Sequence, residues 1–182
     1  AAGTRPDPQP LAANVDLAIV VMALDADFSA RRLERWAQLI AGSGALPLVL
    51  LNKSDLCEDP QPLADEARRC MPDAQVLVAS AANGFGLDAL RAALRPGLTA
   101  VLLGASGVGK STTLNALLGS ATQPTRPVRA HDGRGMHVTT ARQLFELPHG
   151  ALLIDTPGIR EIAGWAQEEA TPAFADIEDA AI

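Results

Sequence analysis

The segment from Gly104 to Ser111 has the residue types and the spacing of a phosphate-binding loop. It reads Gly-Ala-Ser-Gly-Val-Gly-Lys-Ser and follows the apolar run Ala100–Leu103, so it lies between a predicted strand and a predicted helix. Glycines allow backbone N–H groups to surround phosphate oxygens at a helix N-terminus. We expect Lys110 to reach the β- and γ-phosphates and Ser111 to bind Mg²⁺. The residues expected to contact a nucleotide here are Gly104, Ala105, Ser106, Gly107, Val108, Gly109, Lys110, Ser111 and Thr112.

The tetrapeptide Asn52-Lys53-Ser54-Asp55 follows the apolar run Leu46–Leu51 and has the composition of a guanine reader. The Asp55 carboxylate can accept from the N1 and N2 hydrogens of guanine, and adenine lacks this donor pair. A buried carboxylate that the wrong base leaves unpaired disfavours that base strongly. We expect Asn52 to contact the other edge of the base and Lys53 to belong to the same site. The phosphate loop alone also fits transporter-type ATPases, and the tetrapeptide alone fits a polar turn, but together they predict guanine-nucleotide binding.

The small residues Ala79-Ser80-Ala81 end another apolar run, Val76–Ala79, and precede a glycine-containing turn. The sequence resembles the guanine-backing loop of GTPases, in which small side chains allow a close approach to the base. We expect Ser80 and Ala81 to lie beside the guanine, with the Ala81 N–H donating to its O6 atom.

The tetrapeptide Asp-Thr-Pro-Gly at positions 155 to 158 follows the apolar run Ala151–Ile154. We expect Asp155 to hold Mg²⁺ through water and the Gly158 N–H to contact the γ-phosphate. Position 159 is Ile, where Ras-like enzymes carry the glutamine that orients the attacking water. We therefore hypothesise slow intrinsic turnover, with another residue or a partner completing the site.

A threonine pair between these motifs is the candidate for the first switch. We favour Thr139 over Thr140 as the residue that brings a hydroxyl to Mg²⁺ and an N–H to the γ-phosphate, although the pair could simply open a strand. His137 is the nearest titratable candidate to orient the water, and the alternative is a solvated or RNA-contacting histidine. The predicted catalytic residues are thus His137, Lys110 and Thr139, and the predicted metal ligands are Ser111, Thr139 and Asp155.

These motifs can form one site only if a sheet brings them to the same edge, and the apolar runs of the sequence predict such a sheet. Alternating strand-like and helix-like segments are typical of an α/β fold with three layers and a mostly parallel sheet. The predicted strands are Leu17–Leu24, Leu46–Leu51, Val76–Ala79, Thr99–Leu103, Ala141–Leu147 and Ala151–Ile154, of which Ala141–Leu147 would be an antiparallel edge. The predicted helices are Ser29–Ala41, Leu63–Cys70, Leu87–Leu94 and Ser111–Leu118.

The order of the motifs is circularly permuted relative to an ordinary P-loop GTPase, because the guanine reader precedes the phosphate loop. Together with Leu11-Ala-Ala-Asn-Val-Asp16, the His-x-Thr-Thr segment and Asp-Thr-Pro-Gly-Ile-Arg-Glu, this order resembles the RsgA/YjeQ family of GTPases. The family's switch usually reads Gly-Arg-His-Thr-Thr-Thr, whereas this chain has Met136 and Val138 around the histidine. The resemblance implies a GTPase that converts GTP to GDP with Mg²⁺ late in maturation of the small ribosomal subunit. It also implies that the subunit, with its 16S rRNA and proteins, stimulates turnover.

The resemblance implies a domain organisation in which residues 11–165 form the permuted GTPase domain. Residues 1–10 would be a linker or a remnant of a preceding OB-fold, and the acidic residues 166–182 would lead to a C-terminal zinc-binding domain that this sequence lacks. We expect zinc only in that domain, because Cys57 and Cys70 cannot form a tetrahedral site alone and are expected to be free thiols. Without a membrane-length apolar run or a signal peptide pattern, a cytoplasmic monomer is expected.

Two other functions remain open at this point. Related permuted GTPases act on the large ribosomal subunit, but these typically carry Asn-Val-Gly-Lys-Ser where this chain has Gly at position 107. An assembly module that binds nucleotide with negligible hydrolysis is the other alternative, which Ile159 motivates. The net charge of −6 argues against strong non-specific RNA binding by this domain alone.

Overall fold

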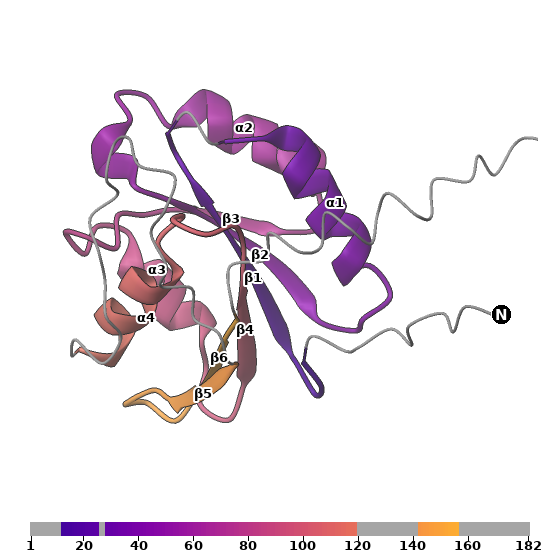
Figure 1. The fold of residues 1–182 in the computed structure, drawn as a ribbon, viewed down its shortest axis with the longest axis vertical. Helices are drawn as coiled ribbons and strands as arrows, with labels where there is room; N and C mark the ends of the chain where they lie inside the picture. Colours follow the sequence, from indigo (N-terminus) through magenta and orange to yellow (C-terminus); the bar gives the residue numbers. More distant parts are fainter. Residues whose placement is uncertain (1–11, 26–27, 120–141, 157–182) are drawn as a thin grey trace, which may run out of the picture.

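The computed structural model describes residues 12–25, 28–119 and 142–156, which form one six-stranded sheet with helices on both faces (Figure 1). The strand order is β3-β2-β1-β4-β6-β5. All neighbours pair in parallel except β5 and β6, which pair antiparallel. The strands are β1 (Leu17–Ala23), β2 (Leu46–Asn52), β3 (Gln75–Val78), β4 (Thr99–Leu103), β5 (Gln143–Glu146) and β6 (Leu152–Asp155). The helices are α1 (Ala30–Ile40), the 3₁₀ turn η1 (Ser54–Leu56), α2 (Gln61–Cys70), α3 (Leu87–Ala93) and α4 (Lys110–Leu118).

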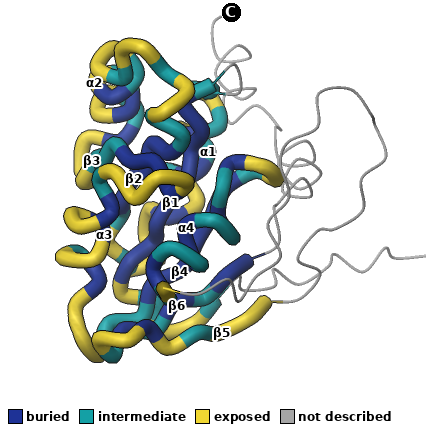
Figure 2. Tube along the Cα trace, turned by 90° about the vertical axis from the view of Figure 1, so that its left-hand side faces the viewer, coloured by how far each residue is buried: buried dark blue, intermediate teal, exposed yellow. Residues whose placement is uncertain are grey.

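The central strand β1 is buried on both of its faces, which explains why its sequence, Leu-Ala-Ile-Val-Val-Met-Ala, is apolar throughout. Ile19 and Val21 pack into one core with residues of α3 and α4, and Ala18 and Val20 pack into a second core with residues of α1 and α2. The sheet is therefore the middle of three layers, with the largely buried strands β1, β2 and β4 between the two layers of helices (Figure 2). This confirms the predicted α/β fold and the antiparallel edge strand.

The helices follow the predicted pattern, with small differences at their ends. Ser29 caps α1 by accepting from the Arg32 N–H, and the buried face of α1 is Leu33, Trp36 and Ile40. Helix α2 begins at Gln61 rather than at Leu63, because a proline is tolerated in the first turn, where its missing N–H costs nothing.

The short connection between α3 and β4 is the place where the two termini of an unpermuted chain would be joined. The Gly97 N–H donates to the Gly150 carbonyl, which ties this connection to the turn before β6. The Thr99 N–H donates to Asp16 Oδ2 at 2.8 Å, and the Asp16 N–H donates back to the Thr99 carbonyl at 2.9 Å. Asp16 is the last residue of the motif quoted above, and through it the start of β1 is held to the joint.

Edge strand β5 is shorter than predicted, at four residues from Gln143 to Glu146. Leu147, which was expected to extend it, is buried and instead donates its N–H to the Ala151 carbonyl in the turn to β6. Cys57 and Cys70 are free thiols, as predicted. Within the described ranges, no helix is both long enough and apolar enough to span a bilayer.

Candidate nucleotide-binding site

Three of the sequence motifs meet at the carboxyl ends of the parallel strands, where ligands bind in open α/β sheets. Asn52 is the last residue of β2, Gly104 directly follows β4, and Asp155 is the last residue of β6. The guanine-backing residues follow β3, and the Ala79 N–H donates to the Leu51 carbonyl, which holds that loop against β2. The fold therefore brings the residues predicted to read the base and to bind phosphate from distant parts of the chain to one edge of the sheet.

Asn52 connects the three loops through one buried carboxamide. Its Nδ2 donates to the Val108 carbonyl in the phosphate loop at 2.9 Å, and its Oδ1 accepts from the Ala81 N–H at 2.9 Å. Only 2% of this residue is exposed, so these bonds are shielded from water. In this structure the Ala81 N–H donates to Asn52, and its predicted bond to the O6 atom of a bound guanine stays a prediction. A carboxamide has both a donor and an acceptor end, and here the protein engages both.

The carboxylate of Asp55 is oriented by Ser80. The Ser80 side chain is fully buried, and its Oγ donates to Asp55 Oδ1. Asp55 itself is exposed, and the Ser54 N–H donates to the Ala79 carbonyl to fix the loop that carries it. A carboxylate held in this way can still accept from two adjacent N–H groups of a ligand.

Lys53 adopts a left-handed backbone conformation, with φ of 64°, between Asn52 and the 3₁₀ turn η1. Its Nζ lies 2.9 Å from Oδ2 of Asp25, a residue that the sequence analysis did not single out. A signal was present, since Asp25 follows the apolar run that became β1 and an acidic residue at the carboxyl end of a central strand points into the ligand-binding edge.

The phosphate loop has two positions where only glycine fits. Gly104 has φ of +140°, and a Cβ there would lie 2.4 Å from the Val21 carbonyl oxygen. Gly109 has φ of +100°, and a Cβ there would lie 2.2 Å from Asn52 Nδ2. The close approach of these backbones allows the loop to sit directly on the ends of β1 and β2.

Lys110 is folded back into this loop. Its Nζ donates to the Gly104 and Ala105 carbonyls, each at 2.9 Å, and only 7% of the residue is exposed. Burial lowers the pKa of Lys110 to about 8, and the negative charge of Asp155 partly opposes that change. The ammonium group is thus already placed in the loop that would surround phosphate oxygens.

Asp155 is fully buried, and neither of its carboxylate oxygens has a hydrogen-bond partner among the described residues. Burial raises the pKa of Asp155, while the Lys110 charge and the nearby Thr156 N–H partly oppose the rise. An orphaned carboxylate of this kind fits a divalent cation that is otherwise held by a hydroxyl and by phosphate oxygens, as Mg²⁺ commonly is. Within the described ranges there is no group of three His, Cys, Asp or Glu side chains that could hold a metal without a nucleotide.

The residues expected to form the switches lie outside the described ranges. These are His137, Thr139, Thr140, Gly158 and Ile159. Their predicted roles in orienting water and in contacting Mg²⁺ and the γ-phosphate therefore stay predictions.

Comparison with known proteins agrees with this geometry. The family model of the RsgA GTPase matches residues 3–165. This chain belongs to the RsgA GTPase family. Two similar relatives are named small ribosomal subunit biogenesis GTPase RsgA. The relative from Syntrophotalea carbinolica is 51% identical, and the match covers 90% of this chain and 45% of the relative. The relative from Methanosarcina acetivorans is 48% identical, and the match covers 100% of this chain and 49% of the relative. The chain spans about half the length of these RsgA relatives.

Solved structures of RsgA-type proteins show the same fold. YjeQ from Thermotoga maritima matches with a TM-score of 0.60 and 28% identity, over 80% of this chain and 48% of its own. YloQ, described as a circularly permuted GTPase, matches with a TM-score of 0.55 and 25% identity, over 81% of this chain and 46% of its own. The predicted family and the circularly permuted P-loop GTPase fold are both confirmed.

Proposed function

We propose that this RsgA family member binds GTP, hydrolyses it to GDP, and serves as a switch in late maturation of the small ribosomal subunit. The observation that carries the proposal is the Asn52 carboxamide, which joins the guanine-reading loop, the guanine-backing loop and the phosphate loop into one site. The names of the relatives support the small subunit as the partner. Turnover would be stimulated when the subunit binds.

Nucleotide selection would depend on residues that the structure already holds in position. Asp55, oriented by Ser80, would accept from the N1 and N2 hydrogens of guanine. Lys110 would exchange its bonds to the loop carbonyls for bonds to phosphate oxygens, and the N–H groups at the start of α4 would add to this anion site. Bound Mg²⁺ would neutralise charge on the phosphates, held by Ser111 and Asp155.

Hydrolysis requires an oriented water that attacks the γ-phosphorus as GDP leaves. The Ile159 side chain cannot hydrogen-bond to that water, so we propose that His137 orients it once the ribosomal subunit is bound. We also propose that Thr139, with Thr140 as the second choice, contacts Mg²⁺ and the γ-phosphate, and that the Gly158 N–H contacts the γ-phosphate. Both contacts would form in the GTP state and be lost after hydrolysis.

The remaining parts of the proposal follow from the expected partner. A protein that matures the subunit would contact 16S rRNA and ribosomal proteins, in the cytoplasm, as a monomer. Residues 1–10 and 166–182 would connect the GTPase domain, residues 11–165, to flanking domains of the OB-fold and zinc-binding kinds.

The test is the rate of GTP hydrolysis by the full chain alone, with purified small subunits and with purified large subunits. We expect strong stimulation by small subunits only, and we expect His137→Ala to lose it while GDP affinity is retained. His149→Ala is the matched control, because His149 Nε2 bonds to the Leu94 carbonyl before the amino end of β6, whereas the predicted nucleotide site lies at the carboxyl ends of the strands. Stimulation by large subunits, or by neither, would contradict the proposal.

A further inference from the structure

One ion pair at the ligand-binding edge links two loops that the motifs alone do not connect. Asp25 lies two residues after β1, and Lys53 lies one residue after β2. Their side chains meet at 2.9 Å, with 28% of the Asp25 side chain and 19% of the Lys53 side chain exposed. The Leu24 N–H donates to the Asn52 carbonyl at 2.8 Å, which holds the two loops together beside the pair.

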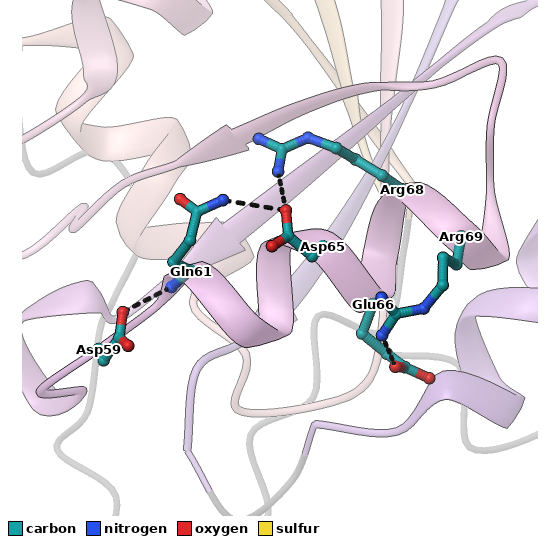
Figure 3. A network of polar contacts seen from close by, with 6 residues as sticks. All are labelled: Asp59, Gln61, Asp65, Glu66, Arg68 and Arg69. Carbon is teal, nitrogen blue, oxygen red and sulfur yellow. Dashed lines mark hydrogen bonds and ion pairs between the residues drawn. The ribbon is translucent and has the colours of Figure 1, made fainter.

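Three other ion pairs in the described ranges are of a different kind, because each joins two residues of one helix. Figure 3 shows two of them on α2, where Arg68 pairs with Asp65 and Arg69 pairs with Glu66. These pairs join residues one turn apart on an exposed helix surface, and about half of the Arg68 and Asp65 side chains is exposed. Surface pairs of this kind stabilise a fold only slightly. The Asp25–Lys53 pair is better shielded and bridges 28 residues of sequence, so it can fix the position of a side chain.

Lys53 lies within the tetrapeptide that is predicted to read the base. It lies between Asn52, which holds the phosphate loop, and Asp55, which is aligned by Ser80. Its four-carbon stem can cover the apolar face of a planar base while the ammonium group stays polar. A lysine side chain has many rotamers, so a partner that selects one of them before binding lowers the entropy cost of binding.

We propose that Asp25 is a positioning residue of the nucleotide site, which holds Lys53 in the conformation that covers the face of bound guanine. The inference rests on the proposed binding of guanine nucleotide. Asp25 acts through Lys53 and does not contact the ligand. The loop after β1 thereby becomes part of the base site, although it lies outside the four sequence motifs.

The test is a double-mutant cycle on the full chain, with fluorescent ribose-labelled GDP as the probe. We expect Asp25→Asn to weaken binding about 3- to 10-fold, mainly through faster dissociation, because one long side chain must then be ordered on binding. Lys53→Met should weaken binding at least as much. In the double variant, Asp25→Asn should add nothing to Lys53→Met, because its effect passes through the lysine.

Two control variants and a measurement of thermal stability distinguish a role of Asp25 in positioning Lys53 from a role in folding. Asp65→Asn removes the charge from an exposed carboxylate on α2 and should leave GDP affinity unchanged. Asp25→Glu keeps the charge and should restore part of the affinity lost in Asp25→Asn. Thermal unfolding of the nucleotide-free variants shows whether each is folded.

The outcomes distinguish this inference from the function on which it rests. Wild-type affinity in folded Asp25→Asn, or additive losses in the double variant, would overturn the role of Asp25 alone. A wild-type chain that does not bind GDP would overturn the proposed function, and this inference with it.

Discussion

At the scale of single residues, the carboxamide of Asn52 leaves no space beside the phosphate loop. A Cβ at Gly109 would lie 2.2 Å from its Nδ2, and Gly109 also has φ of +100°. Gly42 has a similar φ of +79°, but nothing lies within 4 Å of a Cβ built there. An alanine at position 42 would therefore introduce backbone strain alone, whereas an alanine at position 109 would introduce strain and a steric clash.

We predict that Gly109→Ala is much more destabilising than Gly42→Ala. Gly42→Ala, the control, should lose about 1 kcal/mol of unfolding free energy from backbone strain alone. Gly109→Ala should lose about 2–4 kcal/mol, because it also displaces the Asn52 carboxamide and leaves buried polar groups without partners. Urea denaturation of the nucleotide-free proteins measures both values. Equal losses would show that the Asn52 connection is not rigid.

Lys110 predicts a pH dependence of stability. Its pKa is lowered from 10.5 to about 8 in the folded protein, so between these values the unfolded chain binds more protons. Stability contributed by this residue should therefore rise as the pH increases from about 8 to 10.5. Other groups titrate there too, so the measurement is the difference between wild type and Lys110→Met in urea denaturation at both ends of this range. An identical pH dependence in the two proteins would contradict the burial of the ammonium group.

For the buried carboxylate of Asp155, we predict that Asp155→Asn raises the stability of the nucleotide-free protein but removes its response to Mg²⁺. Asp155→Asn removes a buried charge that has no hydrogen-bond partner in the described residues, so the nucleotide-free protein should unfold about 2–4 °C higher. We expect Mg²⁺ to improve the GTP affinity of the wild type, and the same variant should lose that improvement. Calorimetry with and without nucleotide and Mg²⁺ measures both effects. A variant that is less stable and still responds to Mg²⁺ would refute this role.

At the scale of elements, the joint between α3 and β4 depends on Asp16. The Asp16→Ala substitution removes the acceptor of the Thr99 N–H and should cost about 1 kcal/mol. Hydrogen exchange at the Thr99 amide should accelerate with little change in the centre of β1, because only the start of β4 loses a bond. Unchanged exchange at Thr99 would show that the clamp does not hold the joint.

The elements themselves were predictable from sequence because a doubly wound sheet uses long apolar runs. All six strands of the described ranges are predicted, whereas the 3₁₀ turn η1 is not. The remaining differences lie at ends such as Gln61, where a proline is accepted in the first helical turn, and Leu147, where one hydrogen bond to Ala151 closes the turn to β6. The residues that we predict to bind nucleotide in the described ranges could be selected from the sequence because each set lies at the end of an apolar run. The contacts of these residues could not be predicted from the sequence. Asn52 bonds to Val108 and Lys53 pairs with Asp25 between loops that are 56 and 28 residues apart, and no periodic pattern links those loops.

At the scale of the whole molecule, the permuted chain builds the same sheet edge that an unpermuted chain would. Strands β1 and β4 are neighbours in the sheet, although α1, β2, α2, β3 and α3 separate them in sequence. The phosphate loop after β4 consequently meets the guanine reader after β2, and Asn52 joins them. We propose that this edge binds guanine nucleotide through Asp55.

The most direct measurement of that claim compares the affinities of wild type and Asp55→Asn for GDP and for xanthosine diphosphate. Xanthine keeps the N1 hydrogen of guanine but has an acceptor in place of the N2 donor, so it matches an amide and not a carboxylate. We predict that the wild type prefers GDP by about 100-fold or more and that Asp55→Asn reverses the preference. The amide oxygen can still accept from Ser80, so the loop should keep its position. A variant that still prefers GDP would contradict the account, because Asp55 would then not be the residue that reads the base.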